Sequence, residues 1–145
     1  MPATRRLAAI VFTDLVGFTA LAQSDEAGAL RLAEEQKTRA RRLLRAQHGR
    51  LVKSMGDGLL LEFPNALSAV EFSVRLQRDL HDSGVERGGP KLETRVGIHL
   101  GDVEEHGTDI LGDAVNIASR IEPMADPGGV CLSEPVYVQV RNKLP

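Results

Sequence analysis

The chain has 145 residues, of which 42% are hydrophobic and 26% are charged, and its formal net charge is −2. This composition predicts a single globular domain over 1–145 and excludes a disordered chain, and the charge argues against a nucleic-acid binder. The single cysteine, Cys131, excludes an intrachain disulfide and is typical of a reducing compartment. No apolar segment is long enough to span a bilayer. We therefore expect a cytoplasmic domain without direct membrane contact, or the cytosolic part of a longer membrane-anchored protein.

The first predicted elements are a strand and a long helix. Residues 7–12 are apolar without alternation, which is typical of a central strand covered on both faces. Ser24 or Asp25 can cap the helix, which is expected to run to about Gln47. Its predicted buried stripe, in which one lysine contributes only its stem, consists of Leu30, Ala33, Lys37, Ala40 and Leu44.

A β-hairpin and a second helix follow. The hairpin has strands at 51–55 and 59–63 on either side of a glycine-rich turn at 56–58. The helix begins at 64–65, and a flexible connection is expected over 83–90. The helix residues predicted to face the core are Ala69, Phe72, Leu76 and Leu80.

The remaining predicted elements are shorter. The stretch 94–101 alternates between apolar and polar residues, which predicts a strand with one face in the core. A polar arm or hairpin is expected over 102–109, and a short helix over 112–121. A brief strand after 127–129 and a last helical turn or two at 135–140 complete the chain.

The order of these elements, β-α-β-β-α-β followed by short additions, is that of the split β-α-β arrangement. We therefore predict an α+β fold of the ferredoxin-like or palm type, with a mainly antiparallel sheet, helices on one face and C-terminal extensions. In this arrangement the third strand lies between the first and the second and is antiparallel to both. Asp14, at the end of the first strand, and Asp57, in the hairpin turn, should then be neighbours.

Two carboxylates at one end of a sheet repel each other unless a cation lies between them. Two Mg²⁺ or Mn²⁺ ions held by Asp14 and Asp57 could activate a hydroxyl group and neutralise a triphosphate. Taken singly, Asp14 could instead cap a helix, and Asp57 could be an ordinary turn residue. Backbone N–H groups at the following helix start could hold the β- and γ-phosphates, namely those of Val16, Gly17, Phe18 and Thr19.

Four further polar residues are candidates for binding a nucleotide. Asn116 and Arg120 lie four apart on one face of the short helix. Arg120 could stabilise the negative charge that develops on a phosphate in a transition state, or it could form an ordinary surface salt bridge. Lys53, inside an apolar strand, could extend its ammonium group to solvent or to a ligand. Together with Asp109, which could also be a turn residue, it offers one donor and one acceptor, which suit the N1 and N6 atoms of adenine.

Four collinear stretches resemble the catalytic domain of the class III adenylyl/guanylyl cyclases. They are 12–19, 52–58 (Val-Lys-Ser-Met-Gly-Asp-Gly), 95–101 (Arg-Val-Gly-Ile-His-Leu-Gly) and 109–120 (Asp-Ile-Leu-Gly-Asp-Ala-Val-Asn-Ile-Ala-Ser-Arg). Each is weak alone, but four in the same order are specific. The resemblance implies an enzyme, an adenylate cyclase. Its reaction converts ATP into 3′,5′-cyclic AMP and pyrophosphate by attack of the ribose 3′-hydroxyl on the α-phosphate.

The resemblance also implies roles for individual residues. Asp14 and Asp57 match the two metal-binding aspartates, and the backbone carbonyl of Leu15 can also reach a metal. Lys53 and Asp109 match the pair that selects adenine. Guanylyl cyclases usually carry Glu and Cys at these two positions, so ATP is the expected substrate.

Asn116 matches the residue that orients the ribose, and Arg120 matches the one that stabilises the transferring phosphate. In the family one protomer supplies the metal aspartates and its partner the other residues, so the resemblance implies a homodimer with two shared sites. It also implies a longer parent with a regulatory domain. Family members usually continue into a C-terminal hairpin with a phosphate-binding lysine, whereas this sequence stops at Pro145. Lys143 is not assigned that role, and we expect an uncovered sheet edge.

Three alternatives remain open at this point. The domain could bind ATP, or pair with another cyclase domain, without turnover, which the missing hairpin would favour. It could be another palm-type nucleotidyltransferase, such as a diguanylate cyclase, although it has no Gly-Gly-Asp/Glu-Glu-Phe hairpin. A purely structural α/β domain would leave Lys53, Asp57, Asp109 and Arg120 without an explanation.

Overall fold

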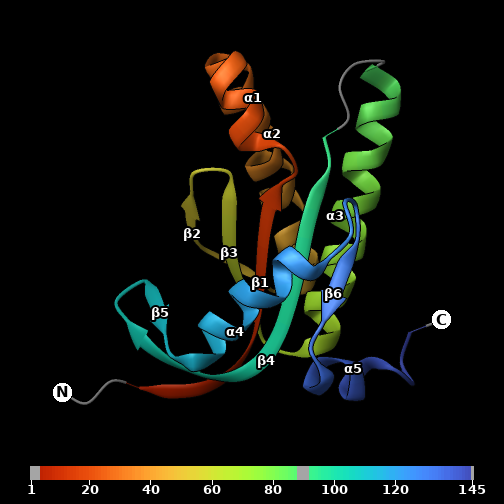
Figure 1. Cartoon of the computed structure of the whole chain (residues 1–145). Helices are drawn as coiled ribbons and strands as arrows, with labels where there is room; N and C mark the ends of the chain where they lie inside the picture. Colours follow the sequence, from red (N-terminus) through yellow and green to blue (C-terminus); the bar gives the residue numbers. More distant parts are fainter. Residues whose placement is uncertain (1–3, 88–91, 145) are drawn as a thin grey trace.

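The computed structural model describes residues 4–87 and 92–144, which form a sheet flanked by helices (Figure 1). The strands are β1 (Arg5–Leu15), β2 (Arg50–Met55), β3 (Gly58–Phe63), β4 (Thr94–His106), β5 (Asp109–Leu111) and β6 (Val130–Leu132). The α-helices are α1 (Phe18–Ser24), α2 (Glu26–Leu44), α3 (Ala66–Arg87), α4 (Asp113–Ile121) and α5 (Glu134–Val140). Two short 3₁₀ helices, η1 (Arg45–Gln47) and η2 (Glu122–Met124), continue α2 and α4. Among the described residues, no helix is both long and apolar enough to cross a bilayer.

The central strand is β1, which lies in the middle of the sheet between β3 and β4. Val11 lies opposite Leu61 of β3 and opposite Ile98 of β4, and both pairings are antiparallel. The order along the sheet is β2-β3-β1-β4-β5, and β6 pairs with β4 in parallel. The third strand therefore lies between the first and the second, as predicted. The turn between β2 and β3 consequently lies at the end of the sheet where β1 stops (Figure 1).

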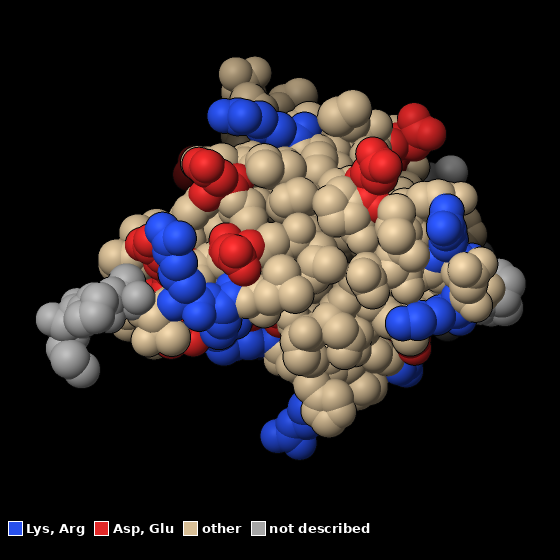
Figure 2. All heavy atoms as spheres, turned by 90° about the horizontal axis from the view of Figure 1, so that it is seen from below, with Lys and Arg blue, Asp and Glu red and all other residues tan. Residues whose placement is uncertain are grey.

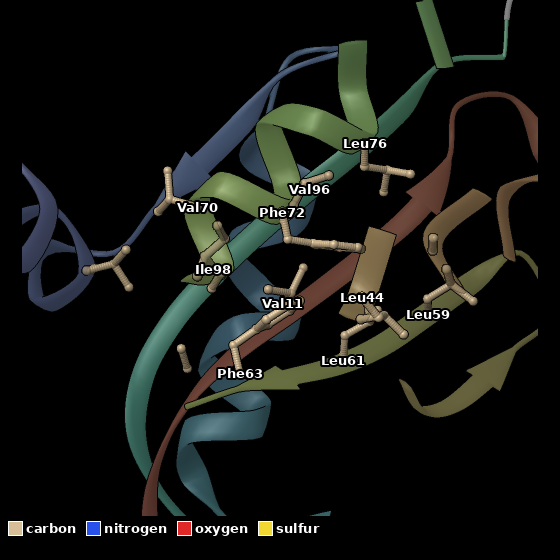
Figure 3. Packing of buried hydrophobic residues seen from close by; sticks show 14 of the residues in the cluster. Val11, Leu44, Leu59, Leu61, Phe63, Val70, Phe72, Leu76, Val96 and Ile98 are labelled. Carbon is tan, nitrogen blue, oxygen red and sulfur yellow. The ribbon is translucent and has the colours of Figure 1, made fainter. Parts of the chain in front are cut away.

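Alternate strand residues pack on the two faces of the sheet. On one face, α2, α3 and α5 cover residues such as Val11, Leu61 and Ile98 (Figure 3). On the other face, α4 contributes Ala114 and Ala118 to a smaller apolar cluster. The predicted α+β fold is confirmed, and α4, which belongs to the C-terminal extension, covers the second face. The helix residues predicted to face the core are all buried, namely Ala69, Phe72, Leu76 and Leu80.

The buried face of α2 differs from the predicted stripe. Leu30 is 56% exposed, and the fully buried residue in the middle of the helix is Gln36 rather than the stem of Lys37. The buried residues Ala29, Gln36, Ala40 and Leu44 set the actual phase of the helix. A polar amide can occupy such a position only when its hydrogen bonds are made, which is the case for Gln36.

Helix boundaries also differ in two places. The chain forms the separate short helix α1 before Asp25, whose side chain caps α2 by accepting a hydrogen bond from the Gly28 N–H at 3.0 Å. The second helix, α3, continues through Ser83 to Arg87, so the predicted connection starts too early. Its remaining residues, 88–90, lie outside the described part of the chain.

Charged side chains of both signs are interspersed on the face of the molecule shown in Figure 2, around a largely uncharged central area. Together with the net charge of −2, this mixture distinguishes the face from the continuous basic surfaces that bind nucleic acids.

Candidate active site

The two aspartate motifs meet where β1 ends. β3 runs antiparallel to β1 with Thr13 opposite Leu59, so the turn that precedes β3 lies beside Leu15. The Leu15 N–H donates a hydrogen bond to Oδ2 of Asp57 at 3.0 Å. Gly58 allows this close approach, because a Cβ there would lie 3.1 Å from the carbonyl oxygen of Thr13. The structure therefore brings Asp57 to the strand end that carries Asp14, as the topology predicted.

The carboxylates of this strand end have the character of hard-cation ligands. Oδ1 of Asp14 is buried and accepts no hydrogen bond from an amide, hydroxyl or basic group of the described residues, and the group beside it that can carry a proton is the carboxyl of Glu122. Such an orphaned oxygen is costly unless a cation or a proton satisfies it. No group of three or more His, Cys, Asp or Glu side chains in the described ranges could hold a metal by itself. Mg²⁺ does not require one, since it is usually bound by one or two carboxylates together with waters and substrate phosphates. The residues present therefore fit Mg²⁺ or Mn²⁺.

A third carboxylate, which the sequence reasoning missed, lies beside Asp14. Glu122, in η2, is only 6% exposed. Burial, followed by a hydrogen bond to the Asp14 carboxylate and repulsion from its charge, raises the pKa of Glu122 to about 8, and Arg95 opposes this rise. η2 can lie so close to the sheet because Gly97 has no side chain, since a Cβ there would lie 2.5 Å from the Cα of Glu122. A glycine within the alternating strand 94–101 was the available signal for such a close approach.

A buried amide lies beneath the same strand end. Oε1 of Gln36 accepts hydrogen bonds from the hydroxyl groups of Thr13 at 3.0 Å and Thr94 at 3.3 Å. Its Nε2 donates to the backbone carbonyl of Asp57 at 2.8 Å. Sequence reasoning missed Gln36 because the helical spacing predicted that its neighbour Lys37 would face the core.

Lys53 and Asp109, the predicted base-selecting pair, are in direct contact. Nζ of Lys53 lies 3.0 Å from Oδ2 of Asp109, and both side chains remain partly exposed. The Lys53 ammonium, and then the Ile110 N–H, hold the pKa of Asp109 below its ordinary value. Arg50, which precedes Lys53 in β2, donates to the Thr108 carbonyl at 2.8 Å and so ties the β4–β5 hairpin to β2.

A charge cluster supports this connection from within the sheet. Glu62 of β3 accepts hydrogen bonds from Arg6 of β1 and from Arg50 of β2, each at 2.8 Å. Burial acts to raise the pKa of Glu62, but the two guanidinium groups outweigh it and hold the pKa below its ordinary value. Arg6 also contacts Glu105 of β4. The cluster thus links β1, β2, β3 and β4 near the hairpin that carries Asp109.

The start of α1 only partly matches the predicted phosphate cradle. The Val16 N–H donates to the Glu93 carbonyl at 2.9 Å, so it has no proton left for a phosphate, and we withdraw Val16 from the candidates. Gly17 adopts the left-handed conformation with φ 75°, and no side chain caps the helix there. The N–H groups of Gly17, Phe18 and Thr19 belong to the first turn, where a helix leaves its donors without intrahelical partners.

Asn116 and Arg120 are both exposed on α4, whereas Ala114 and Ala118 face the sheet. Arg120 forms no ion pair within the part of the chain that the structure describes. Apart from the start of α1, the candidate residues therefore lie in three groups, which are the carboxylates at the end of β1, the Lys53–Asp109 pair, and the outer face of α4. No hydrogen bond or ion pair between described residues joins one group to another.

Comparisons with known proteins identify the family. The family of adenylate and guanylate cyclase catalytic domains matches residues 3–144. A relative from Rhizobium meliloti (strain 1021) is 38% identical over 143 residues, which cover 96% of this chain and 24% of that protein. An adenylate cyclase of Streptomyces coelicolor is 38% identical over 128 residues, which cover 87% of this chain and 32% of its own. The chain thus spans less than a third of the length of these curated relatives.

A solved structure agrees with this assignment. The adenylate/guanylate cyclase/hydrolase from Silicibacter pomeroyi superposes with a TM-score of 0.85 at 31% identity, covering 99% of this chain and 84% of that chain. The family match and the structural superposition thus extend over nearly all of the sequence, and the four motifs lie within them. This chain therefore belongs to the adenylate and guanylate cyclase catalytic domain family.

Proposed function

We propose that this domain is an adenylate cyclase, which converts ATP into 3′,5′-cyclic AMP and pyrophosphate. The observation that carries the proposal is the convergence of Asp14 and Asp57 at one strand end, where a buried oxygen of Asp14 accepts no hydrogen bond from an amide, hydroxyl or basic group of the described residues. Two Mg²⁺ or Mn²⁺ ions held by these carboxylates and the Leu15 carbonyl would lower the pKa of the 3′-hydroxyl and neutralise the phosphates. The relative from Streptomyces coelicolor is named an adenylate cyclase, which supports the same reaction.

The choice of ATP over GTP rests on Lys53 and Asp109. The Lys53 ammonium can donate to N1 of adenine, and the Asp109 carboxylate can accept from its N6 amino group. Guanine presents a donor at N1 and an acceptor at O6, so the same pair would face two mismatched contacts. Lys53 and Asp109 form an ion pair at 3.0 Å in the free protein. We propose that the base inserts between the two side chains, so that the ion pair is replaced by one hydrogen bond from Lys53 to the base and one from the base to Asp109.

The outer face of α4 completes the proposed site. Arg120 is exposed and has no ion-pair partner among the described residues, so its guanidinium is available to charge that develops on the α-phosphate. Asn116, one turn earlier, can hold the ribose so that its 3′-hydroxyl faces the phosphorus. The N–H groups of Gly17, Phe18 and Thr19 remain candidates for the terminal phosphates.

We further propose that two copies of the chain share each site. The exposed face of α4 points away from the sheet that carries Asp14, so these side chains are open to contact with a second copy of the chain. One protomer would supply Asp14 and Asp57, and its partner Lys53, Asp109, Asn116 and Arg120. The relatives are much longer than this chain, which supports a catalytic domain coupled to a regulatory one.

The test is an assay for cyclic AMP and pyrophosphate with Mg²⁺ or Mn²⁺, run across protein concentration. We expect both products from ATP, little product from GTP, and a specific activity that rises with concentration as dimers form. Absence of cyclic AMP across all concentrations would contradict the catalytic proposal.

A mixing experiment tests the shared site separately. Asp57→Ala and Arg120→Ala proteins should each be inactive, and their mixture should recover about a quarter of the wild-type activity, since half of the dimers are mixed and each has one intact site. No recovery in a mixture that forms heterodimers would contradict the shared site.

A further inference from the structure

We propose that Gln36 is a positioning residue that holds the Asp57 turn in the geometry a metal ion requires. Gln36 is fully buried beneath the strand end and belongs to α2, which contributes none of the candidate site residues. The inference rests on the proposed function in one respect, namely that Asp57 is a metal ligand.

The hydrogen bonds of Gln36 define the orientation of its amide. The backbone carbonyl of Asp57 can only accept, so the group 2.8 Å away must be the Nε2 amino group. Oε1 then faces the hydroxyl groups of Thr13 and Thr94, which can donate. One side chain therefore ties the Asp57 turn to β1 and β4, at the residues that precede Asp14 and Arg95.

Beyond the pairing of Met55 with Gly58 in the β2–β3 ladder, the Asp57 turn has little other support. Met55 and Gly56 are exposed, and Gly56 adopts the left-handed conformation with φ 60°. Two hydrogen bonds hold Asp57 itself. Gln36 binds its backbone carbonyl, and the Leu15 N–H binds its carboxylate. The β2–β3 ladder closes the turn where Met55 lies opposite Gly58, so loss of the first bond leaves Asp57 itself held only through the carboxylate that is needed for the metal.

A role in packing alone does not account for an amide at this position. A methionine or leucine would fill a similar volume in the core without the desolvation penalty of a buried amide. The amide contributes instead a donor aimed at the turn and an acceptor shared by two strands. These are the contacts that fix the distance between the Asp57 turn and the strand that carries Asp14.

Amide hydrogen exchange measured by NMR tests the positioning directly, without nucleotide or metal. In Gln36→Met we expect the Leu15 amide to exchange about five- to tenfold faster, the change that corresponds to one lost hydrogen bond. The adjacent Val16 amide, bound to the Glu93 carbonyl, should keep its wild-type rate. Ser73→Ala removes another buried side-chain hydrogen bond, within α3, and serves as the matched control with unchanged exchange at Leu15.

Binding of Mn²⁺ provides the second measurement. With a non-reactive ATP analogue, electron paramagnetic resonance should show Mn²⁺ bound several-fold more weakly by Gln36→Met than by the wild type. The KM for ATP at saturating Mn²⁺ should change little, because the hydrogen bonds of Gln36 go to Thr13, Asp57 and Thr94 and not to Lys53 or Asp109. Thr13→Val removes one hydrogen bond to the Gln36 amide and leaves its bond to Asp57. It should raise the exchange rate at Leu15 and weaken Mn²⁺ binding, but less than Gln36→Met does. This milder variant decides the matter if Gln36→Met does not fold.

The outcomes separate this inference from the proposed reaction. Unchanged Leu15 exchange or unchanged Mn²⁺ binding in a folded Gln36→Met protein would overturn it. A wild type that binds no Mn²⁺ would overturn it as well, because Asp57 would then have no metal to hold. If the wild type makes no cyclic AMP but both readouts respond as expected, the reaction is wrong and the positioning role of Gln36 stands.

Discussion

Glu122 is the residue through which pH should act most directly on the stability of this fold. Burial and the neighbouring Asp14 carboxylate raise its pKa from 4.5 to about 8. An unfolded chain loses this proton near its ordinary pKa, whereas the folded chain keeps it until about pH 8. Between pH 4.5 and about pH 8 the folded chain therefore binds one proton, on Glu122, that the unfolded chain has lost. The free energy of unfolding therefore falls as pH rises through this window. Above the window Glu122 is ionised in the folded chain, and the whole loss of stability is present.

The magnitude follows from the size of the shift. A rise from 4.5 to about 8 sets a ceiling of about 5 kcal/mol, at about 1.36 kcal/mol per pH unit. Relaxation around a buried carboxylate reduces such energies, so we expect a loss of about 2–3 kcal/mol between about pH 5 and about pH 9. For a chain of this size the melting temperature should fall by roughly 6–9 °C, at about 3 °C per kcal/mol.

The assay is thermal unfolding followed by circular dichroism across this pH range, with EDTA to exclude divalent cations. Glu122→Gln has nearly the same shape and cannot ionise, so its melting temperature should exceed that of the wild type at high pH and approach it at low pH. Glu71→Gln, at an exposed position of α3, is the matched control and should follow the wild-type profile. Parallel profiles for the wild type and Glu122→Gln would refute the reasoning.

Three further changes test other parts of the structure. Gly97→Ala should destabilise the fold by about 1–3 kcal/mol, measured by urea denaturation, because the new Cβ would lie 2.4 Å from the backbone nitrogen of Glu122. A wild-type midpoint would contradict this close approach. Phe72→Ala, at the centre of the larger apolar cluster, should cost about 3–5 kcal/mol in the same assay. Lys53→Glu combined with Asp109→Cys should shift the ratio of kcat/KM values from ATP toward GTP. Unchanged ATP preference in a folded, active variant would contradict the assignment of this pair.

Much of the fold could be predicted because its signals are local. The apolar run of β1, the glycine turn at Asp57 and the cap at Asp25 each depend on a few adjacent residues. Strand order then followed from the connection rules of a β-α-β-β-α-β chain, and it brought Asp57 to the end of β1. The boundary of α3 was less predictable, since glycine and serine inside a helix resemble a loop when their packing is unknown.

The sequence by itself determined the two aspartate motifs, the paired Lys53 and Asp109, and their order along the chain. Only the tertiary structure decided which polar groups surround them. Gln36 is buried because three partners from β1, β4 and the Asp57 turn satisfy its amide, and helical spacing carries no information about those partners. Glu122 lies against Asp14 because η2 crosses β4 at a glycine, which brings together carboxylates that are far apart in the sequence. Side-chain hydrogen bonds and pKa values depend on distances in space, and these exist only once the sheet and its helices have packed.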